Sequence, residues 1–166
     1  AYMLDSVGIA GQTLVATALG AGSVSRARQL TRATGRAGLV TGAIIGVVFA
    51  IVGLFAGHLF SPTPHVQILI AVGMVTMGVF FPLQGWMMAI DGILIGARDY
   101  RYLAGTCTLT AVVYIALILV LASIVTPIMP NDLSRTAMLW AAFNVVLMGG
   151  RGLFNGLRVR SDVWMK

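Results

Sequence analysis

The sequence predicts an all-α integral membrane protein, a bundle of five transmembrane helices. Of the 166 residues, 58% are hydrophobic and only 10% are charged. Soluble domains carry about 45–50% apolar and about 25% charged residues. The apolar residues form runs longer than about 18 residues, which is the length that crosses a bilayer as a helix. None of these runs alternates between polar and apolar residues, as the strands of an outer-membrane barrel do.

Charged residues separate five apolar segments, and we expect each segment to cross the membrane once. Their approximate ranges are 1–20, 37–60, 66–97, 103–126 and 136–157. Segment 37–60 has about 24 residues without a charge, or roughly 36 Å of helix at about 1.5 Å per residue, against a hydrocarbon core of about 30 Å. Because the sequence opens inside an apolar segment without an initiator Met, we expect it to be a fragment.

Basic residues gather in alternate connections between these segments, and this alternation predicts the orientation of the chain. One side holds Arg26, Arg28, Arg32, Arg36, Arg98, Arg101, Arg158, Arg160 and Lys166. The connections on the other side hold only Arg135, together with Asp132. We therefore expect the Arg-rich loops and the C-terminus to face the cytoplasm, in the plasma or inner membrane of the cell. The net charge of +6 follows from this topology and requires no nucleic acid partner.

Three arginines in the first basic connection recur every four residues, at Arg28, Arg32 and Arg36. Residues at this spacing share one face of a helix. We expect a short helix along the inner membrane surface, with its arginines at lipid phosphates.

Glycines predict where the helices pack. Small residues that recur every four or seven positions form a stripe on which another helix can pack closely. The stripes are Gly38, Gly42, Gly46, Gly53 and Gly57, then Gly92 and Gly96, then Gly152 and Gly156. They indicate a bundle and carry no chemistry.

Asp91 is the most informative polar residue, because a charge within the bilayer is costly and usually faces protein or water. It precedes Arg98 by seven residues, so it lies about 10 Å from the cytoplasmic boundary. Gln84 lies seven residues before it, on the same helix face, with Met87 and Met88 beside that face. These four residues are candidates for a cavity that binds substrates or a coupling cation. The alternative is that Asp91 binds a neighbouring helix and the methionines only pack.

The first segment repeats this arrangement with Asp5 and Gln12, which are also seven residues apart. We expect both at membrane depth, Asp5 about 22 Å and Gln12 about 12 Å from the cytoplasmic side. Arg151 precedes Arg158 by seven residues, which places it near the depth of Asp91. It is therefore a candidate ion-pair partner of Asp91, with extension to the membrane surface as the alternative.

The residues give little support to an enzyme or a metal site. Both histidines, His58 and His65, lie at the outer connection, and the chain has no zinc-protease motif, nucleophile elbow or phosphate-binding loop. Cys107 is the single cysteine, which excludes an intrachain disulfide. We expect a protein that is not an enzyme and holds no metal.

Three motifs resemble the second lobe of multidrug and toxic compound extrusion (MATE) transporters of the DinF-like branch. They are "LDSVGIAGQTLVATALGAG" followed by "SRARQLTRATGR", then "DGILIGARDYRYL", and finally "LRVRSDVW". Their order and spacing cover essentially the whole chain. Two departures occur in the inner loops, where the family often has Gly-Ala-Gly-Asp: this chain has Gly-Ala-Gly-Ser at 20–23 and Gly-Ala-Arg-Asp at 96–99. The loss of a glycine at Arg98 is expected to alter the turn.

The resemblance implies a twelve-helix transporter in which this chain supplies helices eight to twelve, without the first lobe and the seventh helix. Such proteins exchange organic cations or other amphiphiles for protons or sodium ions by alternating access, with no cofactor beyond the coupling ion. It implies a cation-coupling role for Asp91, whereas other branches carry that acid in the first lobe. The expected partners are the bilayer, small amphiphilic or cationic substrates and the missing lobe. Two alternatives remain open: a lipid-linked sugar flippase of the same superfamily, and a non-transporting membrane scaffold subunit.

Overall fold

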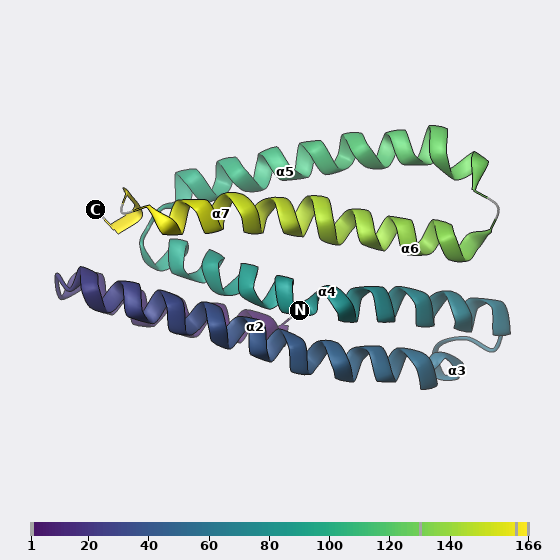
Figure 1. Cartoon of the computed structure of the whole chain (residues 1–166), viewed down its shortest axis with the longest axis horizontal. Coiled ribbons are helices and arrows are strands. Elements are labelled where there is room, and N and C mark those ends of the chain that lie inside the picture. Colours follow the sequence, from purple (N-terminus) through teal and green to yellow (C-terminus); the bar gives the residue numbers. More distant parts are fainter. Residues whose placement is uncertain (1, 130, 162, 166) are drawn as a thin grey trace.

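The fold is known from a computed structural model, which describes residues 2–129, 131–161 and 163–165 and so leaves out Lys166 of the basic tail. All regular structure in these residues is helical (Figure 1). The elements are α1 (Tyr2–Gly20), α2 (Val24–Phe55), α3 (Gly57–Phe60), α4 (Pro64–Gly96), α5 (Tyr100–Val120), η1 (Leu121–Val125), η2 (Thr126–Ile128), α6 (Asp132–Ala142), η3 (Phe143–Gly149), α7 (Gly150–Arg160) and η4 (Val163–Met165). The predicted all-α membrane fold is confirmed.

Four helical rods are long and apolar enough to cross a membrane: Val24–Phe55, Pro64–Gly96, Tyr100–Val125 and Asp132–Arg160. The last joins α6, the π-helical η3 and α7 without interruption. The segment predicted at 1–20 forms the 19-residue α1. It is not among the four, so a fifth crossing stays a prediction.

Successive rods run in opposite directions, so every second connection lies at the same end of the molecule (Figure 1). The α1–α2 turn, the α4–α5 turn and the end of α7 meet at one end, which we call the basic end. Arg26, Arg98 and Arg160 all lie there. The α3–α4 and α5–α6 connections lie at the opposite end. This arrangement groups the basic connections as the alternation in the sequence predicts.

The arginine-rich segment differs from the prediction. It does not form a separate surface helix, because residues 24–36 are the first turns of the continuous helix α2. Ala27, Thr31 and Thr34 are buried in this part of α2, and Arg28, Arg32 and Arg36 are exposed. Burial of one face against neighbouring helices therefore extends α2 beyond its apolar run.

Glycines bring α2 and α4 into backbone contact, as the stripes in the sequence predict. Gly38 lies against the Gly85 carbonyl, and Gly46 lies against the Gly78 carbonyl. A methyl group at any of these four positions would overlap the opposing backbone. Helix α1 packs on α4 in the same manner, with Gly8 against Gly92.

The turn at Arg98 keeps the geometry of a glycine turn, contrary to the expected change. Arg98 has φ 61°, and Gly22 in the other basic-end turn has φ 70°. The following residues close the turns identically, since Asp99 N–H donates to the Leu94 carbonyl and Ser23 N–H to the Ala18 carbonyl, both at 3.0 Å. Arginine therefore occupies a left-handed conformation that favours glycine.

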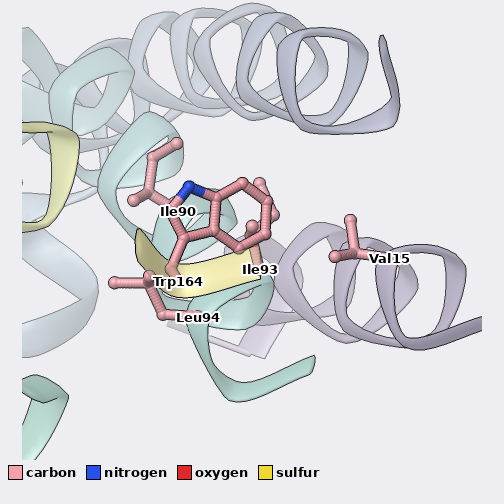
Figure 2. Packing of buried hydrophobic residues seen from close by; sticks show 5 residues of the cluster. All are labelled: Val15, Ile90, Ile93, Leu94 and Trp164. Atoms are coloured by element: carbon pink, nitrogen blue, oxygen red, sulfur yellow. The ribbon is translucent and has the colours of Figure 1, made fainter. Parts of the chain in front are cut away.

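An apolar cluster at the basic end ties the C-terminal residues to the bundle (Figure 2). Trp164 of η4 is 3% exposed and packs with Val15 of α1 and with Ile90, Ile93 and Leu94 of α4. Trp164, which follows α7 in the chain, thus lies against α1 and α4.

Candidate functional site

A row of hydrogen-bonded polar side chains connects α4 to η3, α7 and α5 within the long rods. We call it the polar ladder. It consists of Gln84, Asp91, Thr106, Asn144, Arg151 and Asn155. Gln84 and Asp91 are seven residues apart on α4, and so are Asn144 and Arg151 on the Asp132–Arg160 rod, which runs parallel to α4. This common spacing lets two successive levels of the ladder form.

Asp91 is the centre of the ladder, because each of its carboxylate oxygens accepts a hydrogen bond from α7. Arg151 Nη2 donates to Oδ2 at 2.5 Å, and Asn155 Nδ2 donates to Oδ1 at 2.7 Å. Of the two alternatives for Arg151, the structure has the ion pair rather than extension to the surface. Asp91 and Arg151 are thus both a structural link and a charge pair.

The neutral members hold the rest of the ladder in place. Thr106 of α5 donates to Asn155 Oδ1 at 3.0 Å, which orients the Asn155 amide with its NH₂ toward Asp91. One level away, Gln84 Nε2 donates to Asn144 Oδ1 at 2.5 Å, and Asn144 Nδ2 donates to the Trp140 carbonyl at 2.7 Å. Three rods are therefore joined by polar contacts in a region where lipid offers none.

Burial makes the charge pair sensitive to any change in either partner. The side chain of Asp91 is 9% exposed and that of Arg151 is 23% exposed. Arg151 Nε is buried and has no hydrogen-bond partner among the described residues. Two opposite charges at this burial stabilise each other, and removing one leaves the other poorly solvated.

A second ion pair continues the ladder at the basic end. Arg158 Nε donates to Asp99 Oδ2 at 2.7 Å. The Arg158 guanidinium also stacks on the Tyr102 ring, 4.7 Å from its centroid. Here α7 contacts the α4–α5 turn. Polar contacts along the Asp132–Arg160 rod therefore fix the register of this rod against α4.

The other candidate site residues are not gathered around Asp91. Asp5 is exposed on α1, and Gln12 is half-buried with its backbone against Gly96. Gly8 lies against Met88 and Gly92, so Asp5 is only about one helical turn, roughly 5 Å, from the depth of Asp91. The two acids are closer in depth than the sequence estimate of about 12 Å, but Asp5 is not part of the ladder.

Met87 and Met88 pack within the bundle, away from the main apolar groove. Met87 is fully buried and Met88 is half-buried. A groove of about 740 Å³ lies between α4, α5 and α7, and apolar residues such as Leu83, Leu109 and Val113 form most of it. Neither methionine lines this groove, nor do Gln84 and Asp91. Within this chain, the packing alternative describes Met87.

Asn155 contacts the Asp91 carboxylate but was not among the candidate residues predicted from the sequence. It lies four residues after Arg151, on the same helix face, and this spacing could have identified it. Metal binding has no support in the described residues, where no three His, Cys, Asp or Glu side chains are grouped to hold an ion.

Neither a protein-family model nor a solved structure matches this chain. Among curated proteins, the chain is similar to Protein DETOXIFICATION 42 of Arabidopsis thaliana, with 27% identity over 121 residues. The match covers 73% of this chain and 24% of the relative, so the chain spans about a quarter of that protein. That relative is a MATE family member, and the match supports a multi-pass membrane protein similar to the transporters of that family.

Proposed function

We propose that this chain is part of a secondary active transporter, a cation-coupled antiporter that exports organic cations or other amphiphiles. The observation that carries the proposal is the buried charge pair of Asp91 and Arg151 between two long apolar rods. A charge pair at this depth is costly to maintain, and in membrane proteins such residues commonly serve ion pathways. Similarity to a protein named for detoxification supports efflux as the direction of transport.

The proposed mechanism is exchange of partners at the Asp91 carboxylate. In the state described, Arg151 and Asn155 both donate to it. A proton on the carboxylate removes its charge and weakens the contact with Arg151, so the α4–α7 contact loosens when the acid is neutral. The conformations with a tight and with a loosened α4–α7 contact therefore bind a proton at Asp91 with different affinities. Coupling requires such a difference.

The surroundings of Asp91 favour a proton over a sodium ion as the coupling cation. A hard cation needs several oxygen ligands, and Asn155 directs its NH₂ group, not its oxygen, at the carboxylate. The third group is the Arg151 guanidinium, which only donates. In the proposal, Asp5 and Gln12 form a second polar region on α1, and Gln84, Met87 and Met88 act through the packing of α4.

The test is gradient-driven efflux of a cationic dye by the full-length protein in liposomes. Asp91→Asn should abolish acceleration by an imposed pH gradient, because the amide cannot exchange a proton. Asp132→Asn is the matched control, since Asp132 is exposed at the opposite end and should retain efflux. Undiminished gradient-driven efflux by Asp91→Asn would refute the coupling role. Absence of efflux by the unmodified full-length protein, with every cationic dye tried and under both gradients, would refute the transporter.

Cysteine labelling in intact cells tests which side of the membrane the basic end faces. We propose that the basic end faces the cytoplasm of a plasma or inner membrane, because positive loops are retained on that side. Labelling of a cysteine introduced at exposed Arg101 should need a reagent that crosses the membrane in intact cells. Labelling by an impermeant reagent would reverse the orientation.

A further inference from the structure

Arginines from two helices line a pocket at the basic end, outside the polar ladder. Its lining includes Arg28 and Arg32 of α2 and Arg160 of α7, together with Thr31 and Trp164, and it encloses about 420 Å³. We call it the arginine pocket. Guanidinium groups that line one pocket from two helices are suited to an anion such as a phosphate.

An apolar groove leads away from the arginine pocket between α2, α4 and α7. It encloses about 290 Å³ and shares Thr31, Arg32 and Arg160 with the pocket. Leu39, Trp86, Ile90 and Gly156 form its apolar part, and Arg36 also lines it. The polar part lies at the basic end of the bundle and the apolar part lies deeper among the rods.

A polar pocket that continues into an apolar groove fits one class of ligand. An anionic phospholipid carries a phosphate at the membrane surface and an acyl chain that runs into the hydrocarbon. Basic pockets between transmembrane helices bind the headgroups of such lipids. A free phosphate would contact the arginines but would leave the apolar groove empty.

We propose that the arginine pocket binds the phosphate of an anionic phospholipid and that the groove holds one of its acyl chains. Arg32 and Arg160 contact the phosphate in this assignment, since both line the pocket and the groove. The acyl chain lies against Trp86. Because α2 and α7 both line the pocket, a bound lipid contacts both helices at the basic end.

Quenching of tryptophan fluorescence tests the site in the chain purified in a non-ionic detergent. Phosphatidylglycerol with brominated acyl chains should quench Trp86 saturably, and brominated phosphatidylcholine should quench it only weakly. Replacing Trp86 with Phe should remove the saturable component. Quenching that is equal for the two lipids would overturn the preference for an anionic phosphate.

Charge variants separate the pocket from general attraction to a basic surface. Arg32, Arg36 and Arg160 are all replaced with Gln in one variant, and Arg26, Arg98 and Arg101 in the matched control, whose arginines lie at the same end outside both lining sets. The pocket variant should lose on the order of a hundredfold in affinity for the anionic lipid, and the control less than about fivefold. Equal losses would overturn the site.

Two further measurements complete the test. Arg32→Lys alone keeps the charge and should retain most of the affinity, which guards against a variant that simply fails to fold. Glycerol phosphate should compete only weakly, because it lacks the acyl chain. Competition as strong as that of the lipid would overturn the lipid assignment in favour of a soluble phosphate.

Discussion

The Asp91–Arg151 pair should show a large coupling free energy in a double-mutant cycle. The variants are Asp91→Asn, which keeps the size of the side chain, Arg151→Gln, which is shorter but keeps an amide donor, and the double variant. Arg151→Gln leaves the Asp91 carboxylate, 9% exposed, with Asn155 as its remaining donor. Removing one partner of a buried pair costs about 3–5 kcal/mol, and we expect about 3 kcal/mol here. Asp91→Asn should cost about 2 kcal/mol, because the 23% exposed Arg151 can still reach solvent.

The double variant should lose less stability than the sum of the two single variants. With both charges gone, neither is left unpaired, so we expect a coupling free energy of about 2 kcal/mol. The matched control is the cycle at Asp132 and Arg135, an ion pair at 3.2 Å whose side chains are 53% and 36% exposed. Exposed pairs of this kind couple by about 0.2–1 kcal/mol.

Unfolding in mixed micelles of increasing denaturing-detergent fraction, followed by circular dichroism, measures the free energy of unfolding of each variant. The reasoning depends on burial, so the coupling at Asp91 must exceed that at Asp132. A value at Asp91 equal to or below that of the exposed pair would refute the assignment of the ladder as a buried electrostatic link.

Three other changes test packing and backbone geometry by the same unfolding measurement. Gly38→Ala should lower the free energy of unfolding by about 2 kcal/mol because its methyl group would overlap the Gly85 carbonyl, whereas Gly105→Ala, with open space around it, should change it by less than about 0.5 kcal/mol. Arg98→Gly should raise the free energy of unfolding by about 1 kcal/mol and the midpoint temperature by about 2–4 °C, because the φ of 61° favours glycine. No gain in stability would mean that the Arg98 backbone is not strained. Trp164→Ala should cost about 3 kcal/mol and expose the C-terminal residues to protease, because Trp164 is 3% exposed; unchanged protease resistance would contradict its anchoring role.

Four long apolar helices could be predicted from the length of the apolar runs, and Asp91 and Arg151 could be placed at the same depth in the membrane. Depth follows from counting residues along a helix from a charged boundary, and Asp91 and Arg151 lie seven residues before Arg98 and Arg158. Residues at equal depth can meet if their helices are neighbours. Counting along one helix does not identify its neighbours, so the ion pair and the surface position of Arg151 could not be separated before the fold was known.

Lateral contacts explain the features that the sequence did not predict. The arginine-rich segment continues α2 because Thr31 and Thr34 are buried, and charge alone marked this segment as a surface helix. Trp164, which follows α7 in the chain, joins the apolar cluster because it lies against α1 and α4. Each feature depends on which helices stand side by side, and period and composition carry no information about that.

The two sides of α4 differ in a way that bears on the proposed transport. Toward α2, backbones touch through glycines such as Gly38 and Gly85, and interfaces of this tightness do not slide without overlap. Toward α7, the contacts are side chains that reach across, chiefly Arg151 to Asp91. Neutralising Asp91 changes only this second interface. A proton-driven rearrangement within this chain is therefore expected to move α7 relative to a rigid α2–α4 pair, because only there does the proton alter the relative free energy of two arrangements.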